Sequence, residues 1–340
     1  MTTTVKIPAT VAEMEPGPRP ADIEHDELLR IYGLMQFARA FELEVVDGAG
    51  KQLVPGTTHP GIAQEGSKVG AILGLRTGDQ VLATYRGHVE ALALGCDPVA
   101  VMAEIMARAT GLSKGKGGSM HLCDPSHGLV MTNAIVAGHL PIAGGVALAC
   151  QRRGLGQVTL AMFGDGASCE GEFFETLNMS KLWNVPLVLV CENNGWAITV
   201  PTHMSQATPD IADRARAFAI PADIVDGNDV LAVRAAVASA CDRARQGGGP
   251  QFIEAKTVRW ERHSAFTAHG DREAMRAAWR DVDPIKRYEK QLVAWDVATD
   301  SELGDIAAEQ QARAAEVREA AAEAPWPAPG ASSDDIYARP

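Results

Sequence analysis

The sequence has little that would place it in a membrane or direct it out of the cell. No apolar run approaches the roughly 20 residues that span a bilayer, although 46% of the 340 residues are hydrophobic. Residues 1–20 have neither the apolar centre of a signal peptide nor the Arg- and Ser-rich character of a transit peptide. We therefore expect a cytoplasmic protein, or a mitochondrial one only after processing, that contacts no membrane and buries its apolar residues in a core of its own.

Paired cysteines and an excess of positive charge are also missing. The six cysteines include no Cys-x-x-Cys pair and lie mostly in apolar segments, so we expect reduced thiols. Lys and Arg total 31 against 43 Asp and Glu, which leaves a net charge of -12. This balance argues against nucleic acid or an anionic membrane as the main partner. Any phosphate group must therefore be bound at a local site.

What the sequence does contain is a regular alternation of short apolar runs and helical patterns. The runs at 158–163 and 187–191 are apolar throughout, as expected for strands whose two faces are both covered. Further strands are predicted at 79–84, 223–225 and 252–257. Helices are predicted at 26–46, 64–75, 98–110, 141–150, 170–184, 208–218, 228–246 and 302–323. This order predicts an α/β fold, a doubly wound parallel sheet with helices on both faces.

Composition divides the chain into three parts. Residues 1–25 form a Pro-rich N-terminal arm, 26–325 one large domain, and 326–340 a C-terminal tail that follows the last predicted helix. Within the domain, residues 111–134 are so rich in glycine that they predict a long functional loop rather than a helix or a strand.

The sharpest chemical signal lies directly after two predicted strands. Gly164-Asp165-Gly166 follows the first of the wholly apolar strands, and Asn193-Asn194 follows the second. Ligands of doubly wound sheets bind at the carboxyl ends of the strands, where glycine lets the backbone approach a diphosphate. The side chains of Asp165 and Asn194 offer the hard oxygen ligands that Mg²⁺ prefers. They predict a magnesium and diphosphate site, against the plainer alternative of two ordinary strand-end turns.

With these motifs the sequence resembles the alpha subunits of thiamine-diphosphate-dependent 2-oxo acid and acetoin dehydrogenases, whose cofactor signature begins Gly-Asp-Gly and ends Asn-Asn after a similar interval. The resemblance runs from Asp26 to Tyr337. It rests on the ordered motifs Tyr85-Arg86-Gly87-His88, Gly115-Lys116-Gly117-Gly118-Ser119-Met120-His121, Glu192-Asn193-Asn194-Gly195, Arg262-His263-Ser264 and Asp335-Ile336-Tyr337. It implies a thiamine-diphosphate-binding fold. It also implies an oxidoreductase that decarboxylates a 2-oxo acid such as pyruvate, or cleaves acetoin, and passes the acyl group to a lipoyl acyltransferase.

The resemblance also implies roles for single residues. The metal, Mg²⁺ or Ca²⁺, would be bound by Asp165, Asn194 and the backbone carbonyl of Trp196. The diphosphate would be bound by Tyr85, Arg86, and the backbone amides of Gly166 and Ala167. The family usually has Tyr where this chain has Trp196, a change that keeps the carbonyl ligand and alters the packing beside it.

The remaining implied contacts concern the two rings of the cofactor. Ala134 and Val136 stand where the backbone of the family meets the aminopyrimidine, although the family commonly has Gly in place of Ala134. His59 and His263 match imidazoles close to the thiazolium, where a histidine that titrates near neutrality can move protons and stabilise charge. His263 would thus contact the cofactor and, together with His59, take part in catalysis. Many relatives have His where this chain has Glu261.

A chain of 340 residues has room for only one cofactor-binding domain. In the family that it resembles, a beta subunit supplies the carboxylate that activates the cofactor. The resemblance therefore implies an alpha2-beta2 heterotetramer with thiamine diphosphate at the interface. The implied partners are the beta subunit, the lipoyl domain of a dihydrolipoyl acyltransferase and a small 2-oxo acid or acetoin.

Several alternatives stay open on the sequence alone. The motifs at 95–97, 102–105 and 109–112 look like acetoin-type subunits, whereas 197–202 looks like pyruvate and branched-chain types. A nucleotide-binding oxidoreductase is suggested by Gly154-x-Gly156, but position 159 is Thr where that motif needs a third glycine. A catalytically inactive scaffold subunit would have lost the metal ligands, which are intact here.

Overall fold

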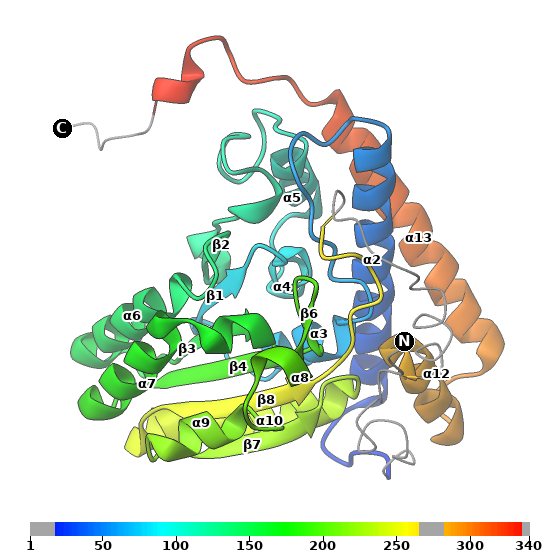
Figure 1. Cartoon of the computed structure of the whole chain (residues 1–340). Coiled ribbons are helices and arrows are strands. Elements are labelled where there is room, and N and C mark those ends of the chain that lie inside the picture. The colour runs from blue at the N-terminus through cyan, green and yellow to red at the C-terminus, as the bar shows by residue number, and fades with distance from the viewer. Residues whose placement is uncertain (1–17, 265–281, 335–340) are drawn as a thin grey trace.

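The computed structural model describes residues 18–264 and 282–334. Six parallel strands form its central sheet, so the predicted α/β class is confirmed (Figure 1). In their order across the sheet the strands are β2 (Leu129–Asn133), β1 (Gln80–Thr84), β3 (Thr159–Gly164), β4 (Leu187–Asn193), β8 (Gln251–Lys256) and β7 (Ala222–Asp226). From β1 the chain adds β2 on one side and β3 with β4 on the other. The sheet therefore has a topological switch point at β1 and β3.

Helices cover both faces of the sheet because successive side chains of a buried strand point to opposite sides. In β3, Leu160 and Met162 pack into one core, whereas Ala161 and Phe163 pack into the other. The second core is covered by α6 (His139–Arg153), α7 (Gly171–Trp183) and α9 (Ala212–Ala217). The first is covered by α2 (His25–Gly50), α3 (Glu65–Leu73), α4 (His88–Ala93), α5 (Pro98–Ile105), α10 (Val230–Arg243) and α13 (Asp300–Glu323).

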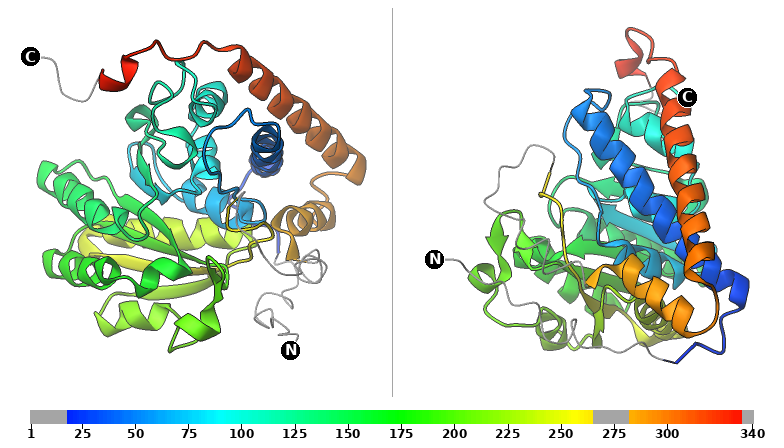
Figure 2. Two further views of the ribbon diagram at one scale, coloured as in Figure 1. Left: turned by 45° about the horizontal axis from the view of Figure 1, so that its top comes forward. Right: turned by 90° about the vertical axis from the view of Figure 1, so that its right-hand side faces the viewer.

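A third cluster joins α2 and α13 to α12 (Pro284–Ala294) at the side of the sheet. Helix α13 lies along α2 (Figure 2). The two run in the same direction, since the Tyr32 hydroxyl donates to the carbonyl of Leu303 at 3.4 Å and Arg318 pairs with Asp47 at 2.6 Å. The predicted C-terminal helix is therefore a structural element that packs against α2.

Short elements complete the described chain. They are the hairpin β5 (Trp196–Ala197) and β6 (Val200–Pro201), the helix α8 (Thr202–Ser205), the turns η1 (Gly118–Met120), η2 (Pro125–His127), η3 (Asp165–Cys169) and η6 (Ala331–Ser333), and the π-turn η4 (Ala244–Gly248). In residues 18–264 and 282–334, no helix combines the length and the apolar character that a membrane span requires. Most of the predicted N-terminal arm and the motif Asp335-Ile336-Tyr337 lie outside the described residues.

The predicted long loop at 111–134 is wrong in its second half, where strand β2 forms. Strand β2 lies at the edge of the sheet, where it pairs with β1 only. Its sequence does not alternate apolar and polar side chains, so no local pattern predicted a strand there.

The glycine-rich first half is a loop, and a buried carboxylate organises it. Glu104 accepts hydrogen bonds from the backbone amides of Ser113, Gly115, Gly117 and Gly118 at 2.7–3.1 Å.

Helices α3 and α10 approach closely because glycine faces α10. A Cβ on Gly70 would lie 2.6 Å from the carbonyl oxygen of Val230 and 2.8 Å from the Cβ of Val233. One turn to either side, Gly74 is equally crowded by Val237 of α10, and Gly66 by the backbone of Gly227 and Asn228 in the turn before α10. By contrast, Gly145 on α6 has open space where its Cβ would be.

We predict that Gly70→Ala lowers the free energy of unfolding by about 1–3 kcal/mol, because an added methyl group in a filled interface forces the two helices apart. The matched change Gly145→Ala should instead raise it by about 0.5–1 kcal/mol, since alanine loses less backbone entropy in a helix. Chemical denaturation of the two variants measures both effects. Equal stability of the two variants would contradict the close packing of α3 on α10.

Candidate active site

One cavity collects side chains from the carboxyl ends of five of the six strands. The residues just after β1, β2, β3, β4 and β8 all reach it, as expected at the switch point of a doubly wound sheet. It is lined by Gln64, Thr84, Tyr85, Arg86, Asn133, Ile135, Val136, Ala137, His139, Gly164, Asp165, Gly166, Ala167, Glu170, Glu192, Asn194, Trp196, Ala197, Ile198, Arg259 and His263. The predicted site residues are thus largely brought together.

Asp165 and Asn194 meet because β3 and β4 pair in register. Gly164, the last residue of β3, lies opposite Glu192, the residue before the end of β4, so the two strands end within one residue of each other. The carboxylate of Asp165 is buried, and its Oδ2 has no hydrogen-bond partner among the described residues. Burial raises the pKa of Asp165 to about 7, against the opposing charge of Arg259. A buried carboxylate oxygen with no partner is a position that a cation would stabilise.

The hairpin β5–β6 closes over the start of η3. The amide of Trp196 donates to Asn194 Oδ1 at 3.2 Å, which turns the chain back over the end of β4. A Cβ on Gly166 would lie 2.9 Å from the Cβ of Ala197, so only glycine allows this approach. Gln206 donates to the backbone carbonyl of Asp165 at 3.1 Å and holds the turn from the other side.

Three rings cluster at the end of β1, and two of them, those of Tyr85 and His263, line the cavity. The ring of His59 lies 4.5 Å from that of Tyr85 and 5.0 Å from that of His263, between ring centroids. Arg86 joins the same segments, since it donates to the carbonyl of Pro60 at 2.5 Å and to that of His263 at 3.1 Å. The segment bearing His263 is thereby tied to the end of β1.

The expectation that His59 titrates near neutrality is wrong. Its ring is buried, and burial, followed by the positive charge of Arg86, lowers its pKa to about 3. His59 is therefore neutral at physiological pH, and its Nδ1 has no hydrogen-bond partner within the described chain. A neutral imidazole accepts one hydrogen bond and donates another. Unlike the imidazolium cation, it has no additional proton to transfer.

The segment after β2 brings Ile135, Val136 and Ala137 to the cavity. Ala134 immediately follows the strand but is not among the described residues that line the cavity. The side chains of Ile135 and Val136 are exposed, not core residues as their apolar character alone would suggest.

A buried ion cluster supports the floor of the cavity. Lys68 is fully buried, and its ammonium lies 2.7 Å from Glu90 and 2.9 Å from Glu192. Although burial opposes its charge, Glu192 and Glu90 raise the pKa of Lys68, so it stays protonated. Glu192 also accepts a hydrogen bond from Ser67 at 2.6 Å. The residue before Asn193-Asn194 is thus held by helix α3.

Sequence reasoning missed Arg259, which lines the cavity three residues beyond β8. It donates to the carbonyl of Ile198 at 2.7 Å, and its Nη1 lies 3.3 Å from Nδ1 of His263. Because a guanidinium can only donate, Nδ1 of His263 accepts this hydrogen bond. A basic residue between the apolar Val258 and Trp260, just past a strand end, was the available signal.

Two further histidines have structural contacts. His88 is fully buried between Glu42 at 3.0 Å and the hydroxyl of Ser119 at 2.9 Å. His139 begins α6 and donates from Nε2 to the carbonyl of Met162 in β3 at 2.8 Å. Burial lowers the pKa of His139 to about 4, although the bond to Met162 opposes this.

Comparison with known proteins gives a consistent result. The family model for "Dehydrogenase E1 component" matches residues 34–330. The alpha subunit of acetoin:2,6-dichlorophenolindophenol oxidoreductase from Cupriavidus necator is 36% identical over 93% of this chain and 95% of its own length. The corresponding subunit from Bacillus subtilis is 42% identical over 70% of this chain and 71% of its own. The pyruvate dehydrogenase E1 component subunit alpha of Porphyra purpurea is 40% identical over 82% of this chain and 84% of its own.

The burial of His139 predicts a dependence of stability on pH. Its folded pKa of about 4 lies below the ordinary value of about 6.5, so its contribution is complete above pH 6.5 and is lost as the pH falls toward 4. His139→Gln keeps an N–H donor and cannot be protonated in this range. The unfolding free energy of this variant should therefore fall less steeply with acid, by up to about 1.4 kcal/mol per pH unit. The same change at the exposed His203 should leave the slope as it is, and a parallel slope in both variants would contradict the assignment.

Proposed function

The chain belongs to the dehydrogenase E1 component family, and on that premise we propose that it is the alpha subunit of a thiamine-diphosphate-dependent dehydrogenase. This enzyme decarboxylates a 2-oxo acid such as pyruvate, or cleaves acetoin, and transfers the acyl group to a lipoyl acyltransferase. The observation that carries the proposal is the buried oxygen of Asp165, which has no partner among the described residues and lies at the end of β3, beside Asn194.

The residues present fit a cofactor that carries a metal-bound diphosphate. The donor set of Asp165 and Asn194 consists of hard oxygens, and glycine at position 166 keeps the start of η3 free of a side chain. Asp165, Asn194 and the carbonyl of Trp196 would hold Mg²⁺ or Ca²⁺. Side chains or amides for the diphosphate would come from Tyr85, Arg86, Gly166 and Ala167.

The other end of the cofactor would meet the segment after β2 and the ring cluster. Val136 lines the cavity and Ala134 adjoins it, so this segment would face the aminopyrimidine. When bound, thiamine diphosphate supplies a carbon nucleophile and an electron sink. His263 and the neutral His59 would orient the substrate oxygen and hydrogen-bond to it, and Arg259 keeps Nδ1 of His263 as an acceptor.

The site is proposed to be one half of a complete one. The cavity has a volume of about 170 Å³, well below the roughly 300–1,000 Å³ of typical ligand pockets. The carboxylate that activates the pyrimidine would come from a beta subunit, in an alpha2-beta2 assembly that docks the lipoyl domain of an acyltransferase. Residues 26–325 would form the cofactor-binding domain, between an N-terminal arm (1–25) and a C-terminal tail (326–340).

The relatives leave two substrate classes, since some are named for acetoin and others for pyruvate. The test is to co-express the chain with its beta subunit and assay the pair with pyruvate, 2-oxobutyrate, branched 2-oxo acids and acetoin, using an artificial electron acceptor. Turnover that requires thiamine diphosphate and a divalent cation is expected with one of these classes. No turnover with any of them, from a pair that binds the cofactor, would argue for a scaffold role.

We predict that Asp165→Asn weakens binding of thiamine diphosphate with Mg²⁺ to the alpha-beta pair by more than about 100-fold, because loss of even an outer-shell partner can cost that much metal affinity. The substitution preserves shape and removes the charge. Isothermal titration calorimetry measures the effect, and Asp213→Asn on the exposed part of α9 is the matched control. Unchanged affinity in Asp165→Asn would falsify the metal assignment.

We also predict that the folded chain alone, supplied with thiamine diphosphate and Mg²⁺, turns over no substrate. Adding the beta subunit should restore activity, since it completes the cavity and brings the missing carboxylate. Steady-state assays at rising beta-subunit concentration test this. Decarboxylation by the chain alone would place the activating carboxylate within this sequence.

A further inference from the structure

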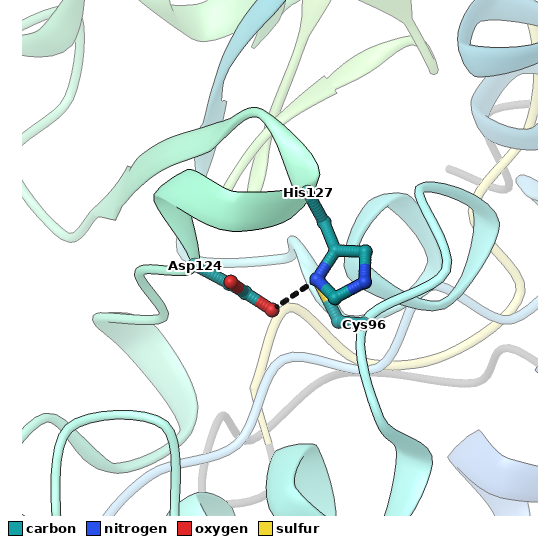
Figure 3. Close-up of side chains that lie close together, drawn as sticks. All are labelled: Cys96, Asp124 and His127. Carbon is teal, nitrogen blue, oxygen red and sulfur yellow. Dashed lines mark hydrogen bonds and ion pairs between the residues drawn. The ribbon is translucent and has the colours of Figure 1, made fainter. Parts of the chain in front are cut away.

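A second group of metal-binding side chains lies away from the cavity, on the turn before β2. The thiol of Cys96, the carboxylate of Asp124 and the imidazole of His127 point toward one another (Figure 3). Their ligand atoms all lie within 4.8 Å of one another. Cys96 belongs to the connection between α4 and α5. Asp124 immediately precedes η2, and His127 is the last residue of η2. The group therefore joins two segments of the chain.

Asp124 is the centre of this group. Its Oδ2 lies 2.7 Å from Nδ1 of His127, and its Oδ1 accepts a hydrogen bond from the Ser126 hydroxyl at 2.5 Å. Although burial opposes ionisation, hydrogen bonds from Ser126, His127 and Cys96 lower the pKa of Asp124. The carboxylate of Asp124 is thus charged. It accepts hydrogen bonds from the ring of His127 and from the buried thiol of Cys96.

We propose that Cys96, Asp124 and His127 form a site for a transition-metal ion of the zinc class. Thiolate and imidazole are ligands that select Zn²⁺ over Mg²⁺ or Ca²⁺, and a carboxylate completes a three-ligand set whose fourth position is left to water. The metal replaces the hydrogens that Cys96 and His127 direct at Asp124. The thiol proton passes to solvent, the imidazole hydrogen moves from Nδ1 to Nε2 as the ring changes tautomer, and no electron is transferred.

The burial of Cys96 and the partial exposure of His127 suit such an ion. Cys96 is 1% exposed, so its thiol is held within the protein. The side chain of His127 is 43% exposed and offers a path of entry from solvent.

The site is separate from the proposed cofactor site. Asp124 and His127 precede β2, whereas Ile135 and Val136 follow it and line the cavity. A five-residue strand at about 3.3 Å per residue places roughly 16 Å between its two ends. The bound ion would tie the edge strand β2 to the segment that leads into α5. In that segment Asp97 caps α5 by accepting a hydrogen bond from the amide of Val99 at 3.0 Å.

Cobalt titration of the full-length chain, free of thiamine diphosphate, tests the proposal. Co²⁺ replaces Zn²⁺ in such sites, and coordination by a thiolate produces a charge-transfer absorption band that oxygen ligands do not. We expect one equivalent of Co²⁺ to produce this band, Zn²⁺ to abolish it, and excess Mg²⁺ to leave it unchanged. Because no cofactor is present, the result is independent of the proposed dehydrogenase activity.

Three variants assign the ligands. Cys96→Ala should abolish the band, while Cys123→Ala, at the neighbouring thiol outside the group, should retain it. His127→Gln alters a part-exposed side chain with little risk to folding, and it should weaken cobalt binding by more than about 10-fold. The absence of a charge-transfer band in the folded chain, its persistence in Cys96→Ala, or unchanged affinity in His127→Gln would each overturn the proposal.

Discussion

The parallel pairing of β3 with β4 is the constraint on which the candidate active site depends. Each strand ends at a polar motif, and the register that sets Gly164 opposite Glu192 brings Asp165 and Asn194 to within one residue of the same level. The apolar side chains of both strands enter two separate cores, so a slip of one residue would move the side chains fitted to one core into the other. The position of the predicted metal ligands is thus fixed by packing far below them.

Buried ion pairs connect the surrounding helices to the residues of the cavity. Lys68 on α3 reaches Glu192 at the end of β4, and Arg39 on α2 pairs with Glu65 on α3 and with Asp283. Removing one partner of a buried pair costs about 3–5 kcal/mol, because the other charge is left without compensation. Helices α2 and α3 are therefore tied to the floor of the cavity by interactions that tolerate little displacement.

The cavity combines this rigid floor with a wall built from irregular segments. Arg86 donates hydrogen bonds to the carbonyls of Pro60 and His263, and Arg259 donates to the carbonyl of Ile198. In both cases a buried charged group replaces the hydrogen bonds that a helix or strand would supply. Such segments can line a ligand site while remaining ordered by single side chains.

The sequence by itself determined the α/β class, five of the six strands of the sheet, the start of α5 and the motifs after β3 and β4. These features follow from local patterns, because the period of apolar residues and the turn residues at strand ends act over a few positions. Family resemblance added Tyr85, Arg86 and His263, which the structure places at the cavity.

Only the tertiary structure decided what depends on distant neighbours. Strand β2 exists because β1 pairs with it, and helix α12 is buried by α2 and α13. The pKa of His59 is lowered to about 3 by its burial and by Arg86, a charge that no local pattern places beside it. The group of Cys96, Asp124 and His127 likewise joins segments that the sequence separates. Burial and long-range charge are properties of the folded chain, and so they could not be read from the order of its residues.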